Sequence, residues 1–433
     1  MSPTQRVIAA AAAGEAGSLA FLRALIHAGE TGEAAVQDTV ARAAAALGCD
    51  VGSLSYRPSD VPMIEEFAGT AAIEPGERRC VTARRRGSGG GRSLVFFAHP
   101  DSEPPSDLGQ WRHPPFAAEI ADGRLYGWGV ADDLAGVAVM VEALRVVQAA
   151  GLTPRGDVII ASTPSKRHAR GVSALLHAGL SSDAAVYLHP AESGMGMGEV
   201  KAFASGQVEF RILVDGKAPP TTEPLQTAFA HLAVNPVDKA LVIAEALRAL
   251  DTRRARRVHH PLLEGAVGRS TNLMISHAAS GQPDRLARVP ATCVLGCALA
   301  FPPGERLSAI RAEVEQAVSA ACAADPWLTE HPAAVVWEAG MTGADVPADH
   351  PLFLSVSTAV SAVTGRAPVV NPMHTGSDIR NPIVQKGIPT VGLGPLCGDL
   401  SQNGSHDEWV DVADYLRAVA VAACIIAEWC GVD

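Results

Sequence analysis

Short apolar segments alternate with helical segments at both ends of this chain. LVFFA (94–98), DVIIAST (157–163) and AAVYL (184–188) predict buried strands, while AGVAVMVEALRVVQAAG (135–151) and GVSALLHAG (171–179) predict helices between them. Such alternation is typical of an α/β fold, in which helices cover a mostly parallel sheet. The ligands of these folds gather at the carboxyl ends of the strands.

The middle of the chain departs from this alternation. VEFRILVDG (208–216) alternates apolar and polar residues, as a strand with one buried face does, and a helix, two strands and a helix follow it. We therefore predict a discontinuous α/β domain of residues 1–205 and 326–433, into which an α+β domain of residues 206–325 is inserted. A length of 433 residues suits two such domains.

A glycine-rich segment separates two strand-like segments near residue 90. Gly87–Gly91 lies between VTAR (81–84) and the more apolar LVFFA (94–98). Two strand patterns joined by a short glycine-rich segment are typical of a β-hairpin. The sequence therefore predicts that these two strands pair with each other.

Charge and hydropathy exclude several classes of protein. The chain has 35 Lys and Arg residues against 46 Asp and Glu, a net charge of −11, which argues against nucleic acid as a partner. Hydrophobic residues make up 48% of the chain, which excludes disorder as its main state.

The apolar segments are too short or too interrupted to predict a membrane protein. The longest unbroken one, AVAVAACIIA (418–427), falls well short of the roughly 20 residues that a membrane span needs. The alanine-rich amino-terminal segment is interrupted by Arg6 and Glu15, and it lacks the three-part pattern of a signal peptide. We expect a cytoplasmic protein that does not enter a membrane.

Polar residues gather at four of the predicted strand ends. His99 and Asp101 follow the strand at 94–98, and Asp132 and Asp133 follow a glycine-containing turn. The other two segments are His189-Pro190-Ala191-Glu192 and His374-Thr375-Gly376-Ser377-Asp378. An imidazole directly after a buried strand, with a carboxylate two residues further on, suits a metal ligand and the group that orients it.

The order and spacing of six segments resemble a known enzyme family. The segments are LVFFAHPD, LYGWGVADDLAGVAVMVEAL, STPSKRHARG, VEFRILVDGKAP, IPTVGLGP and HDEWVDVADYLRA. They are similar to the acetylornithine deacetylase, succinyl-diaminopimelate desuccinylase and glutamate carboxypeptidase family of co-catalytic zinc hydrolases. The resemblance implies a zinc-binding α/β domain with a mixed sheet, an inserted lid and dimerisation domain, and a homodimer.

The first part of the family's site is matched in full. The resemblance implies that His99 is a zinc ligand and that Asp101 orients it. It also implies that Asp132 is the aspartate that bridges two metal ions in the family.

The next segment departs from the family. Where the family has Asp-Glu-Glu after Thr-Pro, this chain has Ser165-Lys166-Arg167. The two glutamates are the family's general base and a ligand of its second zinc, and a protonated lysine or arginine can serve neither purpose. Lys166 could act as a base only if its pKa were lowered, and the nearby Arg167 and Arg170 favour that direction.

Two further ligand positions differ. His189 stands where the family has a glutamate or aspartate before proline, with Glu192 three residues beyond it, so either residue could complete a site with His99. The family's second-site histidine would fall at Gly404, whereas the nearest histidine of this chain is His406. A second metal site is therefore not expected.

The lid departs as well. The family's lid histidine, which reaches the partner's active site, follows Gly-Lys-Ala, but here Gly216-Lys217-Ala218 is followed by an insertion before Ala230-His231. His231 is the candidate for that histidine, and a histidine at a helix start with no such role is the alternative.

Three hypotheses follow for the function. The first is amide or acyl hydrolysis at a single zinc held by His99, Asp132 and either His189 or Glu192. The second is a metal-free acid–base enzyme for cyclisation, elimination or dehydration, and the third is a silent binding or partner subunit. The catalytic candidates are Lys166, His168, Asp101 and His406. The candidates for binding a small anionic substrate are Arg167, Arg170, His231, His374, Ser377, Asp378 and Arg380.

Overall fold

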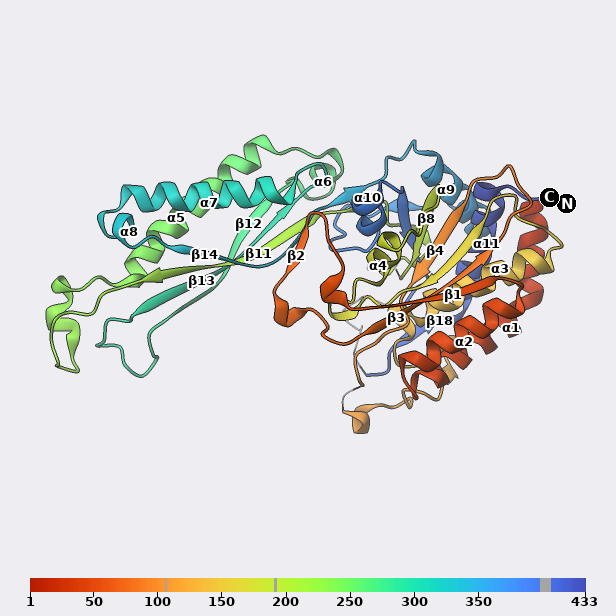
Figure 1. The fold of residues 1–433 in the computed structure, drawn as a ribbon, viewed down its shortest axis with the longest axis horizontal. Helices are drawn as coiled ribbons and strands as arrows, with labels where there is room; N and C mark the ends of the chain where they lie inside the picture. Colours follow the sequence, from red (N-terminus) through yellow and green to blue (C-terminus); the bar gives the residue numbers. More distant parts are fainter. Residues whose placement is uncertain (106, 191–192, 398–405) are drawn as a thin grey trace. The chain divides into compact units, whose positions relative to one another are not determined.

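The computed structural model describes residues 1–105, 107–190, 193–397 and 406–433. The chain divides into two compact units (Figure 1). The first unit comprises residues 1–64, 70–203 and 345–433, and the second comprises residues 65–69 and 204–344.

A six-stranded mixed sheet forms the centre of the first unit. Its order is β1-β3-β7-β4-β8-β17. Strands β7, β4, β8 and β17 run parallel to one another, and β3 is antiparallel to both of its neighbours, β1 and β7. The strands are β1 (Asp50–Tyr56), β3 (Arg78–Arg85), β4 (Leu94–Ala98), β7 (Val158–Ser162), β8 (Ala184–Leu188) and β17 (Thr390–Leu393). The α/β prediction with a mixed sheet is confirmed.

Helices cover the sheet of the first unit. Helix α3 packs on β4, β7 and β8, α1 and α11 pack on α3, and α4 and α10 pack on each other. Figure 1 shows α4 and α10 across the sheet from α1 and α3. The helices are α1 (Pro3–Gly29), α2 (Glu33–Ala46), α3 (Ala135–Ala149), α4 (Gly171–His177), α9 (Pro351–Thr364), α10 (Arg380–Lys386) and α11 (Val412–Ile425).

Within the described residues, α1 is long and apolar enough to cross a membrane by length and composition alone. Its buried side chains include Val7, Leu22, Leu25 and Ile26, and the helix packs against α3 and α11. Of its most apolar 18-residue window 17% is buried, and core helices and signal sequences both pass the same test of length and composition, so this single helix is weak evidence for a membrane span.

The predicted β-hairpin around Gly87–Gly91 is wrong. Strand β7 lies between β3 and β4, antiparallel to the first and parallel to the second. A Cβ atom on Gly91 would lie 2.0 Å from the carbonyl oxygen of Cys430, and one on Gly87 would lie 2.3 Å from that of Arg155. The glycines therefore allow close approach to neighbouring backbone, which a sequence pattern does not distinguish from a tight turn.

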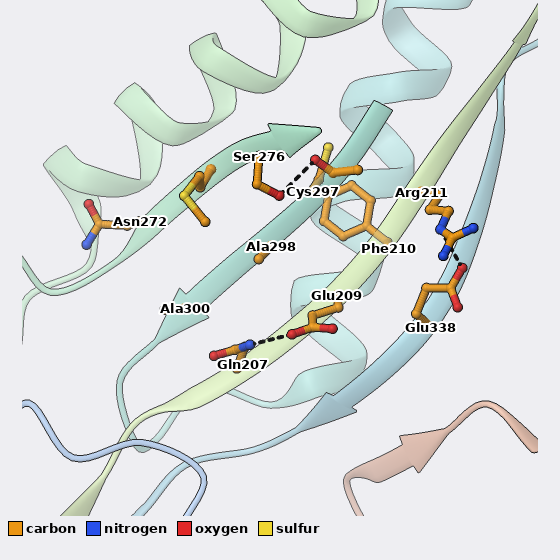
Figure 2. Close-up of a pocket in the computed structure, with 12 residues that line it drawn as sticks. Gln207, Glu209, Phe210, Arg211, Asn272, Ser276, Cys297, Ala298, Ala300 and Glu338 are labelled. Atoms are coloured by element: carbon orange, nitrogen blue, oxygen red, sulfur yellow. Dashed lines mark hydrogen bonds and ion pairs between the residues drawn. The ribbon is translucent and has the colours of Figure 1, made fainter. Parts of the chain in front are cut away.

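The second unit is a five-stranded antiparallel sheet with helices on one face. The order is β12-β13-β11-β14-β2, and α5 and α7 pack on the sheet and on each other. The elements are β2 (Glu66–Ala68), β11 (Gly206–Asp215), α5 (Pro236–Arg257), β12 (Asn272–Ser280), β13 (Thr292–Phe301), α7 (Leu307–Ala324) and β14 (Ala334–Met341). Figure 2 shows residues on the other face of the sheet, among them Gln207, Glu209 and Arg211 of β11.

The predicted boundary at residue 326 differs from the division in the structure. Strand β14 pairs along β11, so the inserted unit continues to residue 344. Residues 65–69 also belong to it, because β2 pairs with β14. Both strands contribute by pairing across a long sequence separation, which local patterns do not reveal.

Smaller elements complete the described chain. They are β5 (Ile120–Ala121), β6 (Arg124–Tyr126), β9 (Glu199–Val200), β10 (Phe203–Ala204), α6 (Pro261–Val267), α8 (Pro326–Glu330), β15 (Ala344–Asp345), β16 (Val369–Val370) and β18 (Trp409–Asp411).

Candidate active site

The carboxyl ends of three neighbouring parallel strands bring the site together. His99 follows β4, Lys166 lies just after β7, and His189 follows β8. Asp132 lies in the turn Val130–Leu134, directly before α3. Because β4 lies between β7 and β8 in the sheet, residues at these three ends are neighbours in space.

Asp132 is the centre of the site. Its Oδ1 lies 2.6 Å from Nε2 of His99 and 3.2 Å from Nε2 of His189, and its Oδ2 forms an ion pair with the ammonium of Lys166. Asp132 is 4% exposed. Burial by itself would raise the pKa of Asp132, but His99 and His189 hold it well below its usual value. The carboxylate is therefore the ionised group on which its neighbours converge.

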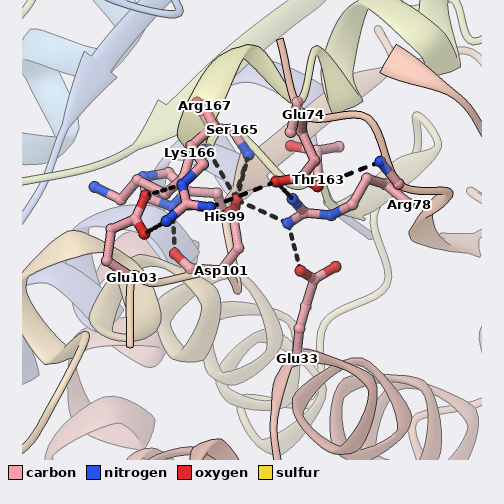
Figure 3. Close-up of polar contacts among 12 residues, drawn as sticks. Glu33, Glu74, Arg78, His99, Asp101, Glu103, Thr163, Ser165, Lys166 and Arg167 are labelled. Carbon is pink, nitrogen blue, oxygen red and sulfur yellow. Dashed lines mark hydrogen bonds and ion pairs between the residues drawn. The ribbon is translucent and has the colours of Figure 1, made fainter. Parts of the chain in front are cut away.

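Asp101 holds the turn that follows β7. It accepts hydrogen bonds from the backbone N–H groups of Ser165 (2.9 Å) and Lys166 (2.8 Å), and Arg78 lies 3.0 Å from its Oδ2 (Figure 3). Its Oδ1 is 3.4 Å from Nδ1 of His99. Burial opposes the ionised form, yet His99 and the Ser165 backbone lower the pKa of Asp101. Asp101 thus orients the His99 ring and fixes the backbone at Lys166.

Glu408 holds the turn that carries Asp132. Its carboxylate accepts hydrogen bonds from the backbone N–H groups of Gly129 (2.9 Å), Ala131 (2.7 Å) and Asp132 (3.2 Å). Burial raises the pKa of Glu408 to about 8, and the three N–H donors act in the opposite direction.

On the helix side of the turn, a Cβ on Gly136 would lie 1.8 Å from the carbonyl oxygen of Leu188, so α3 approaches β8 only because residue 136 is glycine.

His189 has two possible partners for its second ring nitrogen. Nδ1 lies 2.9 Å from Nζ of Lys201 and 3.0 Å from the carbonyl oxygen of Pro190. An ammonium only donates, so a hydrogen bond from Lys201 leaves the proton of a neutral imidazole on Nε2. When Nδ1 instead donates to Pro190, the lone pair of Nε2 is available to a cation.

The donor set suits one metal ion. His99, Asp132 and His189 each offer a ligand atom, and these atoms lie within 4.8 Å of one another. Two imidazoles and one carboxylate are a usual set of ligands for a catalytic zinc with one open position. The other oxygen of Asp132, which would face a second ion, is paired with Lys166.

The expectation that Arg167 and Arg170 lower the pKa of Lys166 is wrong. Burial acts to lower the pKa of Lys166, but the charge and the hydrogen bond of Asp132 act in the opposite direction, and this pKa is raised above its usual value. Arg167 is 57% exposed and pairs with Glu103, and Arg170 donates to the carbonyl oxygen of Pro58. The protonated form of Lys166 is favoured, which is the opposite of what a lysine base requires.

Five of the other predicted residues lie on two segments, the turn Lys166–His168 and residues 374–380. Asp378 accepts a hydrogen bond from the hydroxyl of Ser165 at 2.7 Å, which places its segment beside the turn of Lys166. His374, Ser377 and Arg380, which stand within four residues of Asp378 in the sequence, are buried. His168 is half-buried on the turn Lys166–His168.

Three candidates remain, namely His406, His231 and Glu192. His406 packs edge-on against Trp111, and it is not part of the cluster of possible metal ligands found among the described residues. His231 is exposed and belongs to the second unit. Glu192 lies outside the described residues.

Sequence patterns missed three charged residues of this site. Lys201 is 1% exposed beside His189, Arg78 pairs with both Asp101 and Glu33, and Glu408 supports Asp132. Glu408 stands in the quoted segment HDEWVDVADYLRA, which was the one signal that could have identified it. Lys201 and Arg78 stand in no motif.

Removal of the Lys201 ammonium is expected to strengthen cation binding. In a Lys201→Met variant, Nδ1 of His189 is left to donate to Pro190, so Nε2 is freed for a metal ion. We expect the affinity for Zn²⁺, measured by competition with a chelator, to rise about tenfold. Substitution of a residue that hydrogen-bonds to a metal ligand typically changes metal affinity by about 10- to 100-fold, and this is the lower end of that range. Lys386→Met, which removes an exposed lysine at the end of α10, is the control for net charge. An unchanged affinity in Lys201→Met would contradict this account of His189.

The chain is similar to known proteins over most of its length. The family model described as peptidase family M20/M25/M40 matches residues 95–428. A succinyl-diaminopimelate desuccinylase of Rhodopseudomonas palustris is 27% identical over 356 residues, which cover 80% of this chain and 85% of the relative. An N-formyl-4-amino-5-aminomethyl-2-methylpyrimidine deformylase of Halalkalibacterium halodurans is 22% identical over 400 residues, 89% of this chain and 86% of the relative.

Solved structures agree on the fold. Aminopeptidase PepT from Bacillus cereus superposes with a TM-score of 0.64 at 18% identity, and the match covers 98% of each chain. A protein of Bacillus subtilis described as a dinuclear metal-binding peptidase of the M20 family has a TM-score of 0.60 at 16% identity, over 96% of this chain and 99% of that one.

Proposed function

Because the chain belongs to the peptidase family M20/M25/M40, we propose that it hydrolyses an amide or related acyl bond of a small carboxylate-bearing molecule at a single-metal site. The observation that carries the proposal is the convergence of His99 and His189 on one oxygen of Asp132. Both relatives named above have names of enzymes that remove an acyl group. In the reaction, water adds its hydroxyl to the carbonyl carbon and a proton goes to the departing nitrogen, giving a carboxylate and an amine.

His99, Asp132 and His189 would hold the metal ion, with zinc the expected one. A bound divalent cation supplies Lewis-acid chemistry and a more acidic water. Asp101 orients the His99 ring, and Glu408 holds the backbone of Asp132 in place. These contacts fix the ligand atoms before an ion arrives, which limits the rearrangement needed on binding.

We assign the carboxylate of the substrate to the segment around α10. The contact of Asp378 with Ser165 supports this assignment, because it joins that segment to the turn of Lys166. Arg380 is 5% exposed at the start of α10, and the planar guanidinium fork suits a carboxylate. His374 and Ser377 are further proposed contacts.

Metal content is the decisive measurement for this function. Protein purified without added metal or chelator is expected to contain up to one divalent ion per chain, and added zinc or manganese is expected to raise the content to one. The loaded protein is then expected to release amine from a panel of N-succinyl, N-formyl and N-acetyl amino acids. A content near zero that neither metal raises would remove single-metal hydrolysis.

Metal-free acid–base chemistry is the second candidate. The ion pair of Lys166 with Asp132 favours it, because this ion pair satisfies one oxygen of the carboxylate without a metal ion. Lys166→Ala would then abolish turnover that persists in the presence of a chelator. A silent subunit would show neither turnover nor binding of the panel compounds.

The quaternary structure and location are also proposals. A homodimer through the inserted unit is typical of the family, and sedimentation as a monomer would refute it. We propose that the protein acts in the cytoplasm, which localisation of a tagged full chain would test.

A further inference from the structure

We propose that the ammonium of Lys166 is a tethered cation that takes the place of a second metal ion on Asp132 and donates a hydrogen bond to the reacting carbonyl oxygen of the substrate. The inference rests on the proposed function, because it assigns a catalytic role to a residue of that site. It differs from the metal-free alternative, in which Lys166 would have to transfer protons.

The two oxygens of Asp132 face different partners. Oδ1 is shared by His99 and His189, the proposed ligands of the metal ion. Oδ2 is occupied by Nζ of Lys166. One carboxylate therefore joins a site for a free cation to a cation that is covalently part of the chain.

The position of Lys166 is fixed at both ends. Its backbone N–H donates to Asp101 at 2.8 Å, and its ammonium is held by Asp132. The turn therefore orients the side chain before substrate binds. Donors that are fixed in advance stabilise a developing negative charge without reorganising during the reaction.

Lys166 also faces open space. Its side chain is 27% exposed, against 4% for Asp132. It borders a cavity of about 130 Å³. The residues around this cavity are Ser102, Glu103, Trp128, Gly129, Asp132, Lys166 and Glu408. An ammonium has three N–H donors, and within the described residues Asp132 is the side chain to which Lys166 donates, so others can point to a substrate oxygen in the cavity.

A second divalent ion would have to displace this ammonium. Arg167, the next residue, points away to Glu103 and offers no anionic ligand. Like charges at the same carboxylate repel each other, so Lys166 also weakens the attraction of Asp132 for the ion bound at Oδ1. This effect on affinity can be measured without any turnover.

The experiment compares Lys166→Met with Arg167→Met. Both variants remove one positive charge from the same turn, but only Lys166 touches Asp132. By competition with a chelator, Lys166→Met is expected to bind Zn²⁺ at least tenfold more tightly than the wild type, with one ion per chain, whereas Arg167→Met stays within twofold. An affinity of Lys166→Met within twofold of the wild type, or weaker, would overturn the proposal.

Steady-state kinetics with the best compound of the acyl amino acid panel give the second readout. The interaction is made with the developing oxyanion, so Lys166→Met is expected to lower kcat about 10²-fold with little change in KM. A raised KM with unchanged kcat would mean that Lys166 binds the ground-state substrate and would overturn the catalytic role. If Lys166→Met does not fold, Lys166→Gln, which keeps an N–H donor but no charge, takes its place. It is also expected to bind Zn²⁺ more tightly than the wild type and to have a lower kcat.

Failure of this inference is distinguishable from failure of the proposed function. A wild-type protein that binds no metal overturns the single-metal hydrolase itself. A wild-type protein that binds one metal and turns over substrate, together with an unaltered Lys166→Met variant, overturns the role of Lys166 alone.

Discussion

Asp132→Asn is expected to lower the affinity for Zn²⁺ by about 10²- to 10³-fold and to destabilise the metal-free protein by about 3 kcal/mol. Asp132 is the anionic member of the proposed ligand set and the shared counter-charge of Lys166 and His99. Its loss leaves the Lys166 ammonium without its buried partner. Chelator competition measures the first effect, and urea denaturation of the metal-free protein measures the second.

Asp133→Asn is the matched control. Asp133 is fully buried, and burial raises its pKa well above the usual value, so asparagine replaces a group that favours the neutral form. Its Oδ2 accepts a hydrogen bond from the backbone of His99 at 3.3 Å, which an amide oxygen can replace. We expect a change of about 1 kcal/mol or less. Equal effects of the two substitutions would show that Asp132 has no special place in the site.

The pH dependence of Asp132→Asn has a definite sign. Because the pKa of Asp132 is lowered in the folded protein, its contribution to stability is present above its unfolded pKa of about 3.9 and is lost as the pH falls through the folded value. The difference in stability between the wild type and the variant should therefore be present at neutral pH and shrink in acid. A difference that grows on acidification would contradict the ionised state of Asp132.

Much of the site could be predicted because parallel strands end at one edge of a sheet. His99 and His189 each directly follow an apolar strand, and Asp132 follows a glycine-containing turn, so sequence order was enough to expect them together. Lys201 and Arg78 could not be found in this way. They lie in other segments, and only the fold places Lys201 against His189 and Arg78 against Asp101.

Sequence neighbours also misled the interpretation of Lys166. Arg167 and Arg170 stand beside it in the chain, but their side chains have other partners. The charge that governs Lys166 is that of Asp132, 34 residues away in the sequence. The same limit explains the hairpin and the domain boundary, because β7 and β14 enter their sheets by pairing over long sequence separations. Local patterns predict elements well and their spatial partners poorly.

Arg254→Met is expected to destabilise the second unit by about 3 kcal/mol. Arg254 lies in α5 and is 1% exposed. It bonds to Glu305 at 2.5 Å, to Glu313 of α7 at 2.7 Å and to the hydroxyl of Thr271 at 3.2 Å. Methionine fills the same volume but leaves two carboxylates and a hydroxyl without their shared donor. One side chain thus joins α5 to α7 and to the start of β12.

Hydrogen exchange can measure this effect within the second unit. A loss of about 3 kcal/mol corresponds to roughly 10²-fold faster exchange of the protected amides of α5 and α7. Arg257→Met is the matched control, because Arg257 pairs with the same Glu313 from the same helix but is 59% exposed. An exposed pair contributes about 1 kcal/mol or less, so exchange in this variant should change less than tenfold. If the two variants behaved alike, burial of Arg254 would not be the source of its effect, and the contacts to Glu305 and Thr271 would contribute nothing beyond those to Glu313.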